Sequence, residues 1–248
     1  MLHHIIAVSA SGITLFAKEY IKSNTKVDML GGLITAMQSF AVLRTGLSVT
    51  YIEMRTLGVA ITQNQSVTIV ASVDVTDGPD LARLIASEVL RAFMHRYARE
   101  LDQARTASAD TFASFGNEVP EIIRRSVRPV LDHLASQRGV VLALLTAGQG
   151  NGILYSTQEV DRISVLAHHS RVIDLAAEVA AAKNDIPLAL TLKNDKTTVS
   201  LCRVERSSLI IVTKNQLKAD ECQKEIDDGV ALVRKLLVIS ANLSGQLN

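Results

Sequence analysis

Cysteine is scarce in this chain: among 248 residues there are only two, Cys202 and Cys222. They do not form a Cys-x-x-Cys pair, and a chain of this size can bury a core without disulfides. The two residues therefore predict reduced thiols in a cytoplasmic protein, with a single disulfide between them as the alternative.

Long hydrophobic runs and a surplus of one charge are also absent. No apolar run reaches the ~18–20 residues that cross a bilayer, and the first residues lack the basic region and cleavage site of a signal peptide. The formal net charge is +1, and basic and acidic residues are nearly balanced in each half. A nucleic-acid-binding protein normally carries a basic surplus on one face. We therefore expect a cytoplasmic protein that binds no nucleic acid and associates with a membrane at most peripherally.

The motifs of common active sites are missing as well. No Ser-x-x-Lys, Gly-x-Ser-x-Gly or His-Glu-x-x-His pattern occurs. The adjacent pairs His3-His4 and His168-His169 cannot share one metal ion, because neighbouring side chains point in different directions in a helix or a strand. The glycines between 148 and 152 precede a strand rather than a helix, which indicates a hairpin turn and not a phosphate site. We predict no catalytic residue, no cofactor, no metal ligand, and hence no enzyme.

The sequence contains the same order of predicted strands and helices twice. In each half, two short apolar strands lead into a helix of roughly twenty residues, three strands follow, and a long amphipathic helix closes the set. The strands are expected at 2–9, 12–18, 48–55, 58–63 and 66–74, and again at 139–147, 152–156, 188–193, 197–204 and 208–213. Short turns favour antiparallel pairing. The pattern predicts an α+β fold of two consecutive five-stranded antiparallel sheet domains with flanking helices.

The first of these helices carries apolar residues at helical spacing and an adjacent pair of glycines. Each of Gly31 and Gly32 costs about 1 kcal/mol relative to alanine, and a close approach of the helix to a sheet would compensate. The apolar residues predict one buried stripe, which consists of Leu30, Leu33, Ile34, Met37, Phe40 and Ala41.

Two features divide the middle of the chain. Residues 104–118 show no periodicity and predict a loop that Phe112 and Phe115 anchor to the core. Further on, Pro129 should break or kink a helix that begins at Pro120, because proline lacks the backbone amide and clashes with the preceding turn. This kink is the expected boundary between the domains.

Arginines are denser between residues 91 and 128 than elsewhere in the chain. A solvated helix surface would explain them, since ionised side chains are mostly exposed. The alternative is a patch that binds an acidic partner or an anionic lipid.

The helix expected at 160–183 has more apolar surface than one sheet can cover. Its apolar arc spans roughly 200°, whereas a helix packed on a single sheet needs about 100°. Two explanations stay open: the other domain of the same chain covers the helix, or it packs against the equivalent helix of another subunit. The second explanation defines a candidate partner or dimer interface that consists of Val165, His169, Val172, Ala176, Val179 and Ala180.

This order of elements resembles that of two related families. Residues 1–127 resemble a longin domain, and the stretches that carry the resemblance are 5–20 (IIAVSASGITLFAKEY) and 28–40 (DMLGGLITAMQSF). Residues 129–248 resemble a Roadblock domain, with a leading helix at 129–138, a strand pair, a middle helix, three strands and a last helix.

The resemblance implies a class of partner and no individual site. Longin and Roadblock domains serve as platforms for small Ras-like GTPases, and Roadblock-like domains commonly pair through their middle helices. It therefore implies a non-catalytic regulator or scaffold that binds a small GTPase, in membrane trafficking or signalling. It also implies a homodimer, or a heterodimer with a related longin/Roadblock chain. The alternative function is a ligand-sensing α+β module with a small-molecule pocket between sheet and helices.

Overall fold

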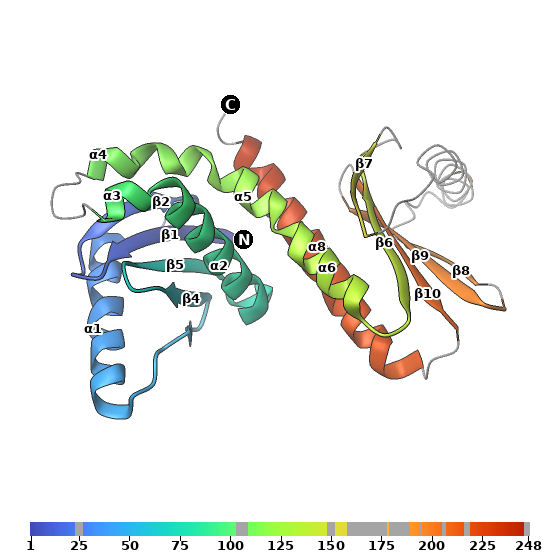
Figure 1. The fold of residues 1–248 in the computed structure, drawn as a ribbon, viewed down its shortest axis with the longest axis horizontal. Helices are drawn as coiled ribbons and strands as arrows, with labels where there is room; N and C mark the ends of the chain where they lie inside the picture. The colour runs from blue at the N-terminus through green and yellow to red at the C-terminus, as the bar shows by residue number, and fades with distance from the viewer. Residues whose placement is uncertain are drawn as a thin grey trace. The chain divides into compact units, whose positions relative to one another are not determined.

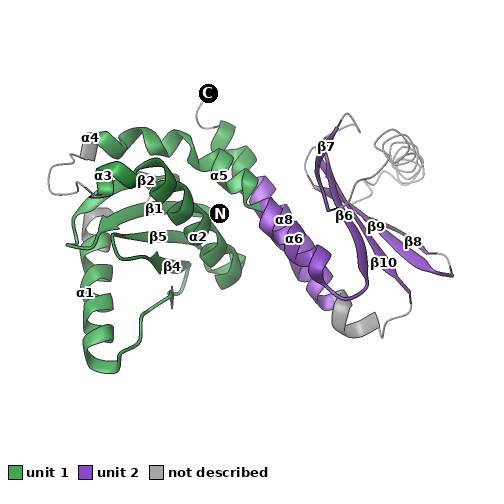
Figure 2. Ribbon diagram, viewed as in Figure 1, with its two compact units in different colours: residues 1–126, 239–248 green, residues 127–238 purple. Residues whose placement is uncertain are grey.

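The computed structural model describes residues 1–22, 27–102, 109–147, 152–157, 178, 189–193, 195–204, 207–215 and 219–245. The chain divides into two compact units, shown in Figure 2. Unit 1 consists of Met1–Ser126 together with Ile239–Asn248, and unit 2 consists of Val127–Val238. Each unit contains one five-stranded antiparallel sheet with helices beside it (Figure 1), which confirms the predicted α+β fold.

The sheet of unit 1 has the strand order β2-β1-β5-β4-β3. Two of its three inner strands, β1 and β5, pair with Ile6 opposite Val70. Nearly every residue of these strands is buried, on both sides of the sheet, so both faces must be covered. The strands are β1 (Leu2–Ser9), β2 (Thr14–Glu19), β3 (Tyr51–Glu53), β4 (Leu57–Gln63) and β5 (Val67–Asp74).

Two long helices pack on this sheet. Helix α1 (Val27–Thr45) places Ile34 in a cluster with Ile6 and Val8 of β1. The alternate side chains of β1 point to the other face. Helix α2 (Pro79–Arg96) follows the short 3-10 helix η1 (Val75–Asp77) and packs on β4 and β5. The buried residues of α2 are Leu81, Ala82, Ile85, Ala86, Val89 and Phe93.

The glycine pair of α1 faces two different environments. A Cβ atom on Gly31 would lie 3.2 Å from Thr14 Oγ1 and 3.3 Å from Val8 Cγ2, whereas one on Gly32 would meet nothing within 4 Å. The predicted close approach to the sheet is therefore confirmed for Gly31 and wrong for Gly32. Gly31 lets α1 lie close to β1 and β2.

Alanine substitutions at the two glycines should therefore differ in effect. We expect Gly32→Ala to raise the free energy of unfolding by ~1 kcal/mol, because alanine is the better helix former and the site is open. Gly31→Ala should gain little or lose stability, since its Cβ would crowd two β-branched side chains. Urea denaturation of both variants measures the difference. Equal stabilisation by the two substitutions would contradict the close packing of Gly31.

A cluster of aromatic rings lies between α2 and the segment that follows it. Phe112 and Phe115 are fully buried, and their ring centroids lie 5.4 Å and 5.0 Å from that of Phe93. The two predicted anchors are thus confirmed. The predicted loop is wrong for residues 109–117, which form helical turns, while 103–108 lie outside the described residues. The turns here are α3 (Ala98–Asp102), α4 (Ala109–Phe112) and the 3-10 helix η2 (Ala113–Asn117).

The helix break falls three residues before Pro129. Helix α5 (Val119–Arg125) ends at Ser126, whose backbone N–H donates to the carbonyl oxygens of both Ile122 and Ile123. Pro129 is the third residue of α6 (Val127–Ser136), where a missing amide costs no intrahelical bond. The predicted position of the break is therefore wrong, because proline is tolerated in the first turn of a helix.

Unit 2 repeats the topology of unit 1. Its strand order is β7-β6-β10-β9-β8, so the five strands of the second half are arranged in the same order as the five strands of the first half. The hairpin predicted around the glycines 148–152 joins two antiparallel strands, with Leu145 opposite Tyr155. The strands are β6 (Val140–Thr146), β7 (Ile153–Ser156), β8 (Ala189–Lys193), β9 (Thr197–Val204) and β10 (Ser207–Lys214).

The last helix, α8 (Ala219–Gly245), belongs to both units. In unit 2 it approaches α6 so closely that a Cβ on Gly229 would lie 2.5 Å from a methyl carbon of Leu134. It buries Val233 and Leu236. Its end, 239–245, belongs to unit 1, whereas the predicted domain 129–248 assigned it to the second half.

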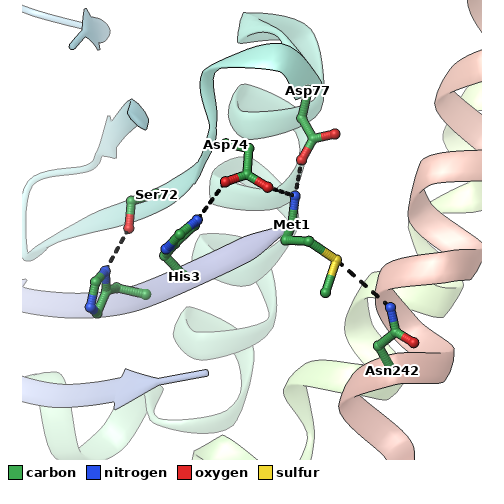
Figure 3. A network of polar contacts seen from close by, with 7 residues as sticks. Met1, His3, Ser72, Asp74, Asp77 and Asn242 are labelled. Carbon is green, nitrogen blue, oxygen red and sulfur yellow. Dashed lines mark hydrogen bonds and ion pairs between the residues drawn. The ribbon is translucent and has the colours of Figure 1, made fainter. Parts of the chain in front are cut away.

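The start of β1 is held by a polar network in unit 1, shown in Figure 3. The ammonium group of Met1 forms an ion pair with Asp74 at 2.7 Å and another with Asp77. His3 Nε2 lies 2.7 Å from the same Asp74 carboxylate. The amide of Asn242, on the last turns of α8, donates to the Met1 sulfur at 3.7 Å. The end of α8 thus contacts Met1, the residue before β1.

Candidate functional site

The interface predicted in the second half lies outside the described residues, as does the helix expected at 160–183 apart from Glu178, which is helical and exposed. Its six residues, Val165, His169, Val172, Ala176, Val179 and Ala180, therefore stay a prediction. A surface of the kind predicted there is found at another place, on helix α1 of unit 1.

Helix α1 leaves several large apolar side chains exposed. Phe40 is 65% exposed, Leu43 is 84% exposed and Leu47, just beyond the helix, is 70% exposed. Leu33 and Met37 are also exposed, and the small Ala36 lies among them. Soluble monomers seldom leave such a patch in water. We define the α1 face as Leu33, Ala36, Met37, Phe40, Leu43 and Leu47.

The predicted buried stripe is wrong for Leu33, Met37 and Phe40. On the inward side of α1 the buried residues are instead Ile34 (1% exposed) and Gln38 (7% exposed). The reason is that α1 is apolar on almost all sides, so helical spacing does not single out the side that meets the sheet.

Gln38 and the nearby strand connection fix the rotation of α1. The side-chain oxygen of Gln38 accepts a hydrogen bond from the backbone N–H of Val49 at 2.9 Å, and its amide donates to the Val49 carbonyl. A buried polar side chain needs such partners. Because Gln38 and Gly31 both face inward, the residues on the opposite side of the helix must face outward.

The α1 face has a spacing and a charge pattern that the sequence already contained. Leu33, Ala36, Phe40, Leu43 and Leu47 are separated alternately by three and four residues, the spacing of a seam between two packed helices. Arg44 is the one charged residue between positions 29 and 52. Its guanidinium carbon lies 5.9 Å from the centre of the Phe40 ring. The sequence therefore contains a row of residues suited to helix packing, but it does not indicate which side of α1 faces the sheet.

The arginines between 91 and 128 are mostly paired with carboxylates. Glu121 accepts hydrogen bonds from Arg124 and Arg125, both at 2.7 Å, and the bond from Arg124 is the largest cause of the lowered pKa of Glu121. Arg91 pairs with Glu88, Arg96 with Glu118 and Arg128 with Asp132. These pairs favour the solvated surface over the patch for an acidic partner.

A Ser-His-Glu group lies within the first sheet. His4 Nδ1 is 3.0 Å from Ser72 Oγ, and His4 Nε2 is 3.4 Å from Glu19 Oε1. Burial lowers the pKa of His4, against the opposing effect of the hydrogen bond to Glu19. His4 and Ser72 are both buried, so the pair is closed to a substrate and connects β1 to β5.

The remaining candidates for chemistry are few. Cys202 is a free thiol, so the alternative of a disulfide to Cys222 is wrong; burial raises the pKa of Cys202. Within the described part of the chain, no three metal-ligating side chains gather at one place. None of the helices described above is long and apolar enough to cross a membrane.

These features define an α+β protein of two similar sheet units with an exposed apolar helix face. No protein-family model and no curated protein matches the chain. Among structures, it is similar to MglB of Myxococcus xanthus, at 16% identity and a TM-score of 0.40, over 44% of this chain and 93% of that one. A Roadblock/LC7 domain from Streptomyces avermitilis is 13% identical, with a TM-score of 0.39, over 44% and 95%.

A longer similarity involves a chain in a homology model of the full-length AP-3 complex. It is 10% identical, with a TM-score of 0.34, and covers 74% of this chain and 99% of that one. These are likenesses of fold, and the two-sheet architecture itself rests on the strand orders described above.

Proposed function

We propose that this chain is a non-catalytic regulator or scaffold that binds a small Ras-like GTPase, as the longin/Roadblock resemblance implies. The observation that carries the proposal is the α1 face, an apolar surface of the kind that a protein partner covers. The two similar sheet units support it, since each offers a helix-covered platform and strand edges for contacts.

The proposed action on nucleotide is indirect. The sequence contains no Gly-Lys-Ser/Thr motif, so we do not expect the chain to hold and hydrolyse GTP itself. It would act on its partner, by ordering the switch loops or by positioning the partner's catalytic groups. Such a regulator works in the cytoplasm or at a membrane surface, in trafficking or signalling.

A binding experiment tests this proposal. The purified full chain is titrated with small GTPases from the source organism, each loaded with GDP or with a non-hydrolysable GTP analogue, in a calorimeter. We expect one GTPase to bind at least about tenfold more tightly in one nucleotide state, which corresponds to ~1.4 kcal/mol, and the chain alone to hydrolyse no GTP.

Two outcomes would contradict the proposal. If no GTPase binds and a metabolite copurifies with the chain, the ligand-sensing module is the better interpretation. If the chain alone turns over GTP and one point substitution abolishes that turnover, the protein is an enzyme.

A further inference from the structure

We propose that one end of the second sheet binds an anionic phospholipid surface through a row of basic side chains. This basic row consists of Arg138, Lys193, Lys196 and Lys214, all of which are exposed. It lies in unit 2 and contains no residue that the proposed function uses. The protein would therefore have a second binding surface besides the α1 face.

The basic row results from the antiparallel order of the strands (Figure 1). β8 and β10 finish at the end of the sheet where β6 and β9 begin. Lys193 and Lys214 are the last residues of β8 and β10. Lys196 directly precedes β9, and Arg138 lies two residues before β6. Each of these four neighbouring strands thus has one basic residue at the same end of the sheet.

Backbone hydrogen bonds hold these positions side by side. The N–H of Lys214 donates to the carbonyl of Gly139 at 2.9 Å, which places Lys214 beside Arg138. The N–H of Asn215 donates to the carbonyl of Lys196, also at 2.9 Å. Neighbouring strands lie about 4.8 Å apart, so the basic row spans about 14 Å.

The charges of the basic row act together. The spacing between neighbouring strand ends is shorter than the Debye length of about 8 Å at physiological ionic strength. Asp195, in the turn between β8 and β9, is exposed and leaves the row with a net charge of +3. Each basic residue close to an anionic bilayer strengthens binding by about fivefold. A row of this charge is suited to reversible binding rather than to permanent anchoring.

The composition of this end of the sheet favours a lipid surface over an acidic protein. A protein interface usually has an apolar centre from which charged side chains are depleted. Here the residues next to the basic ones are the small or polar Gly139, Thr197 and Asn215. Leu192 directly precedes Lys193 and is 43% exposed, so it can enter the headgroup region of a bilayer beside the row.

Co-sedimentation of the full chain with vesicles tests the proposal. We expect binding to phosphatidylcholine vesicles that contain ~30% phosphatidylserine, and none to pure phosphatidylcholine, because the attraction requires anionic lipid. Binding at ~50 mM NaCl should weaken by at least about tenfold at ~500 mM, because salt screens the charges. The double variant Lys193→Gln, Lys214→Gln should also bind at least about tenfold more weakly than the wild type.

The double variant Arg99→Gln, Arg203→Gln is the matched control. It removes the same charge from two exposed positions outside the basic row, and Arg203 lies near the other end of β9. We expect it to bind the vesicles within about twofold of the wild type, because charges beyond the Debye length contribute little. All four substituted side chains are exposed, so both double variants should keep the circular dichroism spectrum of the wild type.

Three outcomes would overturn the proposal. The first is equal binding to both kinds of vesicle, or to neither. The second is equal weakening by the two double variants. The third is a chain that binds polyglutamate and no vesicle, which would assign the basic row to an acidic protein.

The failure of this inference can be told apart from the failure of the proposed function. The titration with GTPases contains no lipid, so a chain that binds vesicles and no GTPase supports the inference and contradicts the proposed partner class. A chain that binds a GTPase and no vesicle does the reverse. The Lys193→Gln, Lys214→Gln variant should bind a GTPase as tightly as the wild type, because the basic row lies outside the α1 face.

Discussion

Phe93→Ala should lower the free energy of unfolding of unit 1 by about 3–5 kcal/mol, the usual cost of removing a buried phenylalanine ring. Phe93 is fully buried on α2, and its ring centroid lies 5.0 Å from Tyr97, 5.4 Å from Phe112 and 5.0 Å from Phe115. The substitution would leave a cavity between α2 and the turns α4 and η2. Those turns also pack on β2, with the Phe115 ring centroid 5.4 Å from that of Phe16, but they would lose the ring that lies between them and α2, so they should lose order first.

Urea denaturation followed by circular dichroism measures this loss, and hydrogen exchange shows whether 109–117 opens before the rest. Tyr97→Phe is the matched control in the same cluster. The Tyr97 hydroxyl is buried and finds no hydrogen-bond partner among the described residues, so its removal should be neutral or slightly stabilising. If Phe93→Ala cost no more than Tyr97→Phe, the cluster would not be the core that the structure shows.

Gln38→Leu should cost about 2 kcal/mol, although it places an apolar side chain in an apolar surrounding. Both hydrogen bonds from the Gln38 side chain to the Val49 backbone would be lost, and the partly buried N–H and carbonyl of Val49 would lack their partners. Since these bonds set the rotation of α1, the substitution should also weaken any contact made by the α1 face.

Thermal unfolding compares Gln38→Leu with Ser39→Leu. Ser39 is the next residue along α1 and is exposed, so its substitution should change the free energy of unfolding by no more than ~0.5 kcal/mol. Equal effects of the two substitutions would mean that the Gln38 bonds do not hold the helix.

The strands could be predicted from the sequence because their signals are local. β1 begins and ends at the predicted residues, and β5 differs from its prediction by one residue. In both cases an apolar run is closed by turn residues that the local sequence supplies. The repeated order of elements followed from the same signals, so the two sheets were predicted with their strands in place.

The candidate site could not be predicted in this way. Which side of α1 faces the sheet is decided by contacts between distant residues, Gln38 with Val49 and Gly31 with Val8 and Thr14. The periodicity of a helix that is apolar on almost all sides does not record those contacts. The same holds for the ion pairs. The pair of Glu121 with Arg124 can be predicted from the sequence because the two residues lie at helical spacing, whereas the pair of Arg96 with Glu118 cannot.

The divided first unit has a consequence for the order in which the chain folds. Met1–Ser126 is synthesised first, but Ile239 and Leu243, which are buried, come more than a hundred residues later. The hydroxyl of Ser240 donates to the Pro120 carbonyl at 3.0 Å, and that bond can form only after the end of α8 has been synthesised. Domains usually fold in turn as they leave the ribosome. Here the domain that starts first is completed last, after the whole of the other has been made.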